Sequence, residues 1–124
     1  MKNRIIIVLM FILSCKTNKR PILKFQNLDK KIFYIQSGKE NKIPIKIYNN
    51  GNDALIIEKH TCNCECTNLS INDYYRVPPK DSVEILATIK GSTAEVGKKK
   101  FIKCTLKTNS DSIFHVFNIN YIVK

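Results

Sequence analysis

The stretch that decides the fold reads IPIKIY at residues 43–48, NNGND at 49–53 and LIIE at 55–58. In the first segment, every second residue is an isoleucine. Such alternation places one set of side chains on each face of a strand, so we expect a strand with one buried face. The Asn-Gly pair that follows is typical of a tight turn. The stretch therefore predicts a strand, a turn and a second strand.

The same alternation continues along the chain. It recurs in 83–89, 102–106 and 117–121, and weaker strands fit 22–26, 32–36 and 74–77. No segment keeps a helical apolar stripe over three turns. About seven short strands, with a turn about every ten residues, predict an all-β protein with an immunoglobulin-like antiparallel β-sandwich. The apolar phase predicts a core of Ile43, Ile45, Ile47, Leu55, Ile57, Ile85, Ile102, Cys104, Leu106, Phe117, Ile119 and Tyr121.

The N-terminus has the composition of an export signal. Lys2 and Arg4 precede an apolar run at 5–13, which ends in Leu-Ser-Cys at 13–15. As a helix this run would span about 14 Å, about half of the apolar core of a bilayer, which suits a signal peptide better than a membrane span. The end of the run resembles the bacterial lipobox, which implies that Cys15 carries the lipid and that the chain is cut before it. A plain secretory signal and an uncleaved N-terminal strand are the alternatives.

These features predict three parts: a lipoprotein signal peptide at 1–14, a lipidated tether at 15–21 and the sandwich domain at 22–124. We expect the protein in the cell envelope, anchored to the membrane through its lipid and facing the periplasm. The formal net charge is +11. An exported protein does not meet the genome, so we expect no nucleic-acid partner. An envelope protein or a glycan remains as the partner class, and Lys98, Lys99 and Lys100 could favour anionic headgroups or acidic glycans.

A cysteine cluster is the part of the chain that resembles a chemical site. His60, Cys62, Cys64 and Cys66 alternate, so an extended strand would place all four on one side, with successive Cα atoms about 6.6 Å apart. That spacing is wide for a disulfide or a tetrahedral metal site, and a curled loop would be needed. We expect a Cys62–Cys66 disulfide with Cys64 free and Cys104 buried in the core. The alternatives are copper or zinc held by His60 and the three thiolates, thiol exchange, or inert thiols.

No catalytic motif is found elsewhere in the sequence. It lacks a Gly-rich phosphate loop, a Gly-x-Ser-x-Gly elbow and a His-Glu-x-x-His motif. The carboxylates are scattered and lie in turn-like contexts, where they cap or turn the chain. We therefore expect no enzyme activity and no cofactor.

An ordered set of short motifs carries a resemblance to a known family. The set consists of Asn-Gly at 50–51, Leu-Ile-Ile at 55–57, Cys-Glu-Cys-Thr at 64–67, Pro-Pro at 78–79, Gly-Lys-Lys-Lys-Phe at 97–101 and Thr-Asn at 108–109. Over about residues 30–124, the chain resembles the bacterial DUF1573 family, an immunoglobulin-like group related to the major-sperm-protein and ASH/hydin sandwiches.

This resemblance implies the sandwich fold and brings no activity with it. It favours Cys64 and Cys66 as the functional pair. The chain departs from the family pattern at Glu65 and Lys80, where glycine is usual, and in its additional Cys62. We expect a non-catalytic binding or assembly module of the envelope. A metal-handling or thiol-active protein that uses the cysteine cluster is the alternative.

Overall fold

The computed structural model describes residues 19–26, 28 and 30–124. The signal peptide at 1–14 and the lipidation site Cys15, both expected from the sequence, lie outside these residues. The described part contains nine strands and one short 3-10 helix. They are β1 (Leu23–Phe25), β2 (Ile32–Ile35), β3 (Glu40–Asn49), β4 (Leu55–Cys62), β5 (Thr67–Leu69), β6 (Tyr75–Val77), β7 (Ser82–Lys90), η2 (Thr93–Glu95), β8 (Lys99–Thr108) and β9 (Phe114–Val123).

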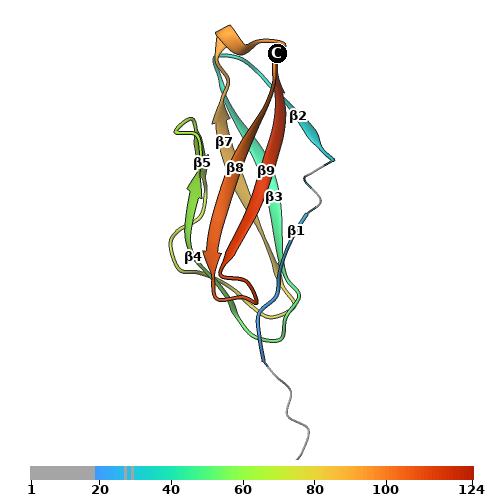
Figure 1. Cartoon of the computed structure of the whole chain (residues 1–124), viewed down its shortest axis with the longest axis vertical. Helices are drawn as coiled ribbons and strands as arrows, with labels where there is room; N and C mark the ends of the chain where they lie inside the picture. The colour runs from blue at the N-terminus through green and yellow to red at the C-terminus, as the bar shows by residue number, and fades with distance from the viewer. Residues whose placement is uncertain (1–18, 27, 29) are drawn as a thin grey trace, which may run out of the picture.

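The strands form two sheets that pack face to face, as Figure 1 shows. One sheet has the order β1-β3-β7-β5 and the other the order β2-β9-β8-β4-β6. The predicted all-β, immunoglobulin-like sandwich is thus confirmed, with nine strands where the alternation indicated about seven. One pairing differs from a purely antiparallel sheet, because β2 runs parallel to β9.

The core lies between the two sheets and consists of the inward-facing phase of the strands. Along β9, for example, Phe117, Ile119, Tyr121 and Val123 are buried and alternate with more exposed residues. All twelve core residues expected from the alternation are buried in the structure. Burying such an aliphatic side chain stabilises the fold by about 1.5–3 kcal/mol, so this layer is the main source of stability.

The segment before β1 is attached to the domain at its last residues. The backbone N of Arg20 donates to Asn52 Oδ1 at 2.9 Å, and the backbone N of Asn52 donates to the Arg20 carbonyl at 3.2 Å. Pro21 is buried. The end of the expected tether therefore lies against the turn that joins β3 to β4. Within the described residues, no helix is long and apolar enough to cross a membrane.

Candidate functional site

One disulfide joins two neighbouring strands of the five-stranded sheet. Cys62, the last residue of β4, lies directly opposite Cys104 of β8, with the two Cα atoms 4.1 Å apart. The prediction of a Cys62–Cys66 disulfide was therefore wrong. Cys104 is buried in the core as expected, but it is bonded to Cys62. The reason is a β-bulge between Ile57 and Lys59, which shifts the register. After the bulge, the even-numbered residues of β4 share a face with the inward residues of β8.

The second disulfide lies within the loop that leads from β4 to β5. It joins Cys64 to Cys66, with the Cα atoms 5.2 Å apart. The loop is tightened by a hydrogen bond from the backbone N of Thr67 to the carbonyl of Cys64, at 3.2 Å. Cys64 is thus not the free thiol that the spacing suggested. The pair is the one that the family resemblance favoured.

The arrangement does not support a metal site. Disulfides occupy all four cysteines of the sandwich domain, and disulfide sulfurs are not the thiolates that bind metal ions. Among residues 19–26, 28 and 30–124, no group of three or more His, Cys, Asp or Glu side chains could hold an ion. The expected convergence of His60 with Cys62, Cys64 and Cys66 is therefore not found.

The Cys64–Cys66 loop is surrounded by surface hollows. Cys66 lines three of them, with volumes of about 430, 340 and 500 Å³. Cys64 lines the second and Glu65 the third. Lys90, at the end of β7, lines all three, and its backbone N donates to the carbonyl of Cys66 at 3.4 Å. The loop thus carries a disulfide that borders these hollows, next to Lys90.

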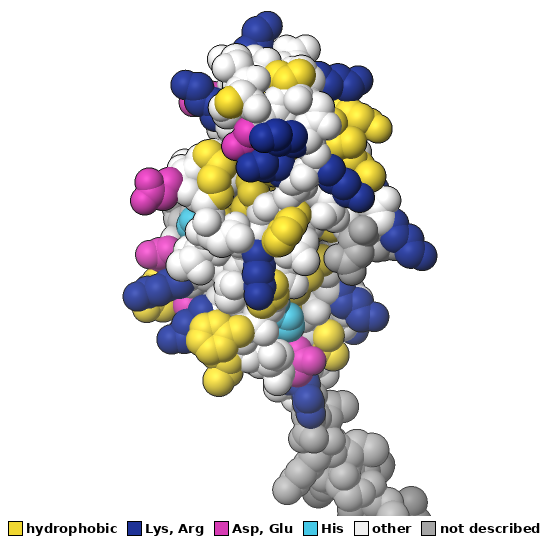
Figure 2. Space-filling model, turned by 45° about the horizontal axis from the view of Figure 1, so that its top comes forward, with side chains coloured by type: hydrophobic (Ala, Val, Ile, Leu, Met, Phe, Trp, Pro, Cys, Tyr) yellow, Lys and Arg dark blue, Asp and Glu magenta, His cyan; other side chains and the backbone are white. Residues whose placement is uncertain are grey.

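A second feature is the outer face of the five-stranded sheet. It presents large apolar side chains to solvent at five positions, which are Ile32, Tyr34, Phe101, Phe114 and Val116. They lie on β2, β8 and β9, three adjacent strands that contain no Asp or Glu. Figure 2 shows apolar and basic side chains interspersed on the face that it displays. We call this surface, together with the outward lysines of β4 and β8, the basic aromatic face.

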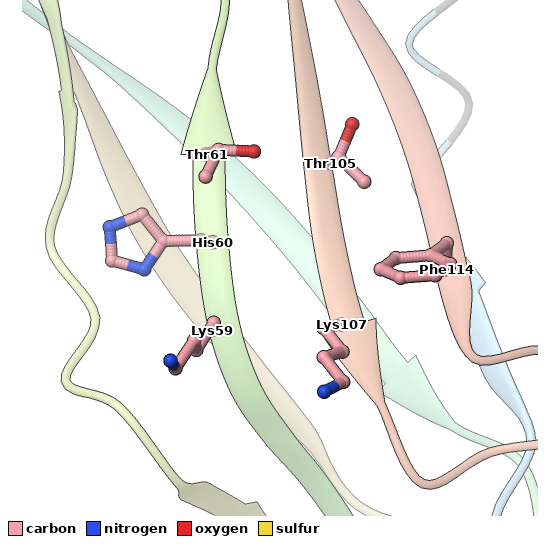
Figure 3. A pocket seen from close by; sticks show the side chains of 6 residues that line it. All are labelled: Lys59, His60, Thr61, Thr105, Lys107 and Phe114. Atoms are coloured by element: carbon pink, nitrogen blue, oxygen red, sulfur yellow. The ribbon is translucent and has the colours of Figure 1, made fainter.

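A shallow groove of about 180 Å³ opens on this face, and Figure 3 shows its lining. The cross-strand register of β4 and β8 pairs Thr61 with Thr105 and Lys59 with Lys107, and Phe114 lies opposite Lys107 on β9. Two hydroxyls, two ammonium groups and one aromatic ring therefore line one hollow. Such a set suits a carboxylate carried on an apolar stem.

The two lysines of the groove have no acidic partner. Like charges that lie directly opposite each other on a sheet are unfavourable. Among the described residues, the one ion pair joins Lys100 to Glu95 at 3.1 Å, so neither Lys59 nor Lys107 is neutralised. A bound carboxylate would relieve this repulsion. The sequence does not predict this groove, because its lining comes from three strands that only the register brings together.

The two histidines take different places. His60 lines the groove, and in Figure 3 its ring points away from Thr105 and Phe114. His115 is packed, since its Nε2 contacts Ser110 Oγ and its ring lies edge-on to Phe25 with centroids 6.2 Å apart.

Several solved structures share the fold at low sequence identity. A protein of unknown function from Porphyromonas gingivalis superposes with a TM-score of 0.62 at 12% identity, over 89% of this chain and 50% of that one. The Escherichia coli chaperone DraB superposes with a TM-score of 0.59 at 10% identity, over 88% of this chain and 58% of that one. The ASH/PapD-like domain of human CEP192 superposes with a TM-score of 0.55 at 6% identity, over 90% of this chain and 89% of that one. The chain spans half the length of the first of these proteins.

At these identities, the likeness concerns the fold alone. No curated protein matches the sequence. A family model described as a protein of unknown function, DUF1573, matches residues 23–120, which is nearly the whole sandwich. The chain therefore belongs to the DUF1573 family.

Proposed function

We propose that this protein is a binding or assembly module of the cell envelope, without catalytic activity, which holds a protein partner on its basic aromatic face. The opposed, unneutralised Lys59 and Lys107 beside exposed Phe114 carry the proposal. A monomer seldom exposes several large apolar side chains on one face unless that face binds something. Chaperones and an adhesin are among the proteins with a similar fold, and a binding role agrees with them.

The charge pattern favours a partner that offers carboxylates next to apolar side chains. A carboxylate between the two lysines would form charge-assisted hydrogen bonds with both ammonium groups and with the hydroxyl of Thr61 or Thr105. The apolar part of the partner would cover Phe114 and Val116, which are 61% and 48% exposed. Electrostatic complementarity of this kind mainly sets specificity and association rate.

Site-specific photo-crosslinking in the native envelope tests this function. A photo-reactive residue at Thr105 should yield a discrete protein adduct, and the same residue at Lys24, on the other sheet, should not. The combined Lys59→Glu and Lys107→Glu variant should lose the adduct, because reversed charge repels a carboxylate. A lipid or glycan adduct at Thr105, or no adduct at all, would contradict a protein partner.

The lipid anchor at Cys15 belongs to the same proposal. It is supported by the basic head, the apolar run at 5–13 and the Leu-Ser-Cys end of that run. Two or three acyl chains would hold the domain durably at a membrane surface. Cys15→Ala should leave an unprocessed precursor or release a soluble form. Unchanged N-terminal processing together with unchanged membrane fractionation would remove the anchor from the proposal.

A further inference from the structure

The two disulfides of the domain lie in opposite settings. Cys62–Cys104 links two hydrogen-bonded strands; Cys104 is fully buried, whereas Cys62 is half-buried. Cys64–Cys66 lies in the loop after β4, where both residues are half-buried. We propose that Cys64–Cys66 is a thiol–disulfide exchange site for a thiol reductant, whereas Cys62–Cys104 is a permanent crosslink. This activity goes beyond the proposed binding function and does not depend on it.

Access favours Cys66 as the sulfur that is attacked. An incoming thiolate must approach a disulfide sulfur from the side opposite to the sulfur that leaves. Cys66 lines three surface hollows, whereas Cys64 lines one. The hollows are open to solvent around the loop, so a small thiol can reach Cys66 without unfolding a strand. Cys104 lines none of these hollows and offers no such route.

The hydrogen bonds favour Cys64 as the leaving group. The backbone N of Cys66 donates to Cys64 Sγ at 3.2 Å. A thiolate accepts such a bond more strongly than a disulfide sulfur does, because its charge is full. The same N–H would therefore stabilise the thiolate that forms on Cys64, and a stabilised thiolate leaves faster. Cys66 Sγ has a longer contact, 3.8 Å from Thr67 Oγ1, so the shorter bond favours the thiolate on Cys64.

Charged side chains of both signs line the hollows around the site. Lys90 lines all three hollows around Cys66, and a cation nearby favours both the incoming and the leaving thiolate. Glu65, between the two cysteines, lines one of the hollows and opposes both thiolates. Lys100 lines one hollow and pairs with Glu95 at 3.1 Å. Glu40 and Lys42 also line the hollow that Glu65 lines. Among the described residues, Lys90 is the one charged residue that lines all three hollows, so we expect it to be the cation with the largest effect.

The reaction can be written with glutathione as the reductant. One glutathione thiolate attacks Cys66 Sγ, forms a mixed disulfide with it and expels Cys64 as a thiolate. A second glutathione thiolate attacks the sulfur of the bound glutathione and expels Cys66. Two electrons pass to the protein, glutathione disulfide forms, and the two thiol protons of glutathione end on Cys64 and Cys66 or in solvent.

The test uses the full chain in detergent, treated with increasing reduced glutathione, quenched with an alkylating reagent and mapped by tandem mass spectrometry. We expect an intermediate that carries glutathione on Cys66 and the alkyl group on Cys64, with Cys62–Cys104 intact. Cys15 falls on a separate tryptic peptide and is followed independently. Reduction of Cys62–Cys104 at the same or a lower glutathione concentration would overturn the proposal. Glutathione mainly on Cys64, or no reduction before denaturant is added, would also overturn it.

Charge variants sharpen the assignment, and they leave both disulfides in place. Lys90→Gln should slow the exchange severalfold, and Glu65→Gln should speed it severalfold. Both effects should shrink as salt is added. Lys24→Gln is the matched control, because Lys24 lies far from the disulfide loop. Lys24 pairs with Tyr48 near one end of β3, whereas Lys90 pairs with Glu40 at the other end. Equal rates for Lys90→Gln and the wild type would overturn the role given to Lys90.

Discussion

Asn49 holds Gly51 in place. The Asn49 side-chain oxygen accepts a hydrogen bond from the backbone N of Gly51 at 3.0 Å, within the turn between β3 and β4. The amide of Asn49 also donates to the carbonyls of Asp53, Val77 and Pro78, at 2.7, 3.1 and 3.2 Å. Because Val77 ends β6, this fully buried side chain joins the turn to the edge of the other sheet.

Asn49→Asp should therefore destabilise the domain strongly. A carboxylate only accepts hydrogen bonds, so the three carbonyls would lose the amide donor of Asn49 and would face a buried negative charge. We expect a loss of about 3 kcal/mol or more in the free energy of unfolding, measured in urea. Asn50→Asp, at the exposed neighbouring position, should change it by less than about 0.5 kcal/mol. Equal losses for the two variants would contradict the role of Asn49.

Gly51→Ala should detach the segment before β1. A Cβ at this position would collide with the carbonyl of Arg20 and lie 2.6 Å from the backbone N of Ile22. Backbone atoms cannot swing away as a flexible side chain can. We expect faster amide exchange at Ile22 and Asn50, whose hydrogen bonds tie the segment to the turn. Unchanged exchange at both would show that the segment is not held by this close approach.

The two disulfides should differ in what they contribute to stability. The Cys62–Cys104 bond spans 42 residues and the Cys64–Cys66 bond spans two. By loop-closure entropy, replacing the first pair by alanines should cost about 3–5 kcal/mol, and replacing the second about 1.5 kcal/mol. Urea unfolding of the two double variants measures both. A costlier loss for the Cys64/Cys66 pair would mean that the loop disulfide is the structural one.

Tyr121 should give the stability a component that depends on pH. Burial raises the pKa of its phenol, the charge of Glu95 raises it further, and Lys100 lowers it in part. The pKa in the folded state therefore lies above the ordinary value of 10.0. The contribution of Tyr121 to stability is complete at pH values below the unfolded pKa of about 10. It is lost as the pH rises through the folded pKa, because the phenol of the unfolded chain ionises first.

The measurement is urea unfolding at a series of pH values, compared with Tyr121→Phe. The wild type should lose stability more steeply than the variant above pH 10, and the two curves should run parallel below it. The difference between the curves removes the other tyrosines and lysines, which titrate in the same range. Parallel curves throughout would contradict a raised pKa.

The sequence could predict what depends on alternation and could not predict what depends on pairing. The inward phase is encoded locally, so positions such as Ile45 and Leu106 were identified as core residues without a structure. Strand β5 was missed because its three residues, TNL, include a single apolar side chain, whereas the equally short β1 (LKF) and β6 (YRV) have two each. The predicted cysteine pairing was wrong because of the bulge after Ile57. The bulge changes which residues of β4 face inward, and nothing in the amino-acid composition indicates it.

Two phenylalanines of β9, one buried and one exposed, allow a test of the proposed binding face. Phe117 is 4% exposed and its ring lies against Phe25, with centroids 5.0 Å apart, whereas Phe114 is 61% exposed and lines the groove. Phe117→Ala should cost about 3–5 kcal/mol of stability, including the cavity left behind. Phe114→Ala should stay within about 0.5 kcal/mol and should still weaken the crosslink formed at Thr105. If Phe114→Ala proved as destabilising as Phe117→Ala, its ring would belong to the core, and the outer face would lose the aromatic group on which its binding role depends.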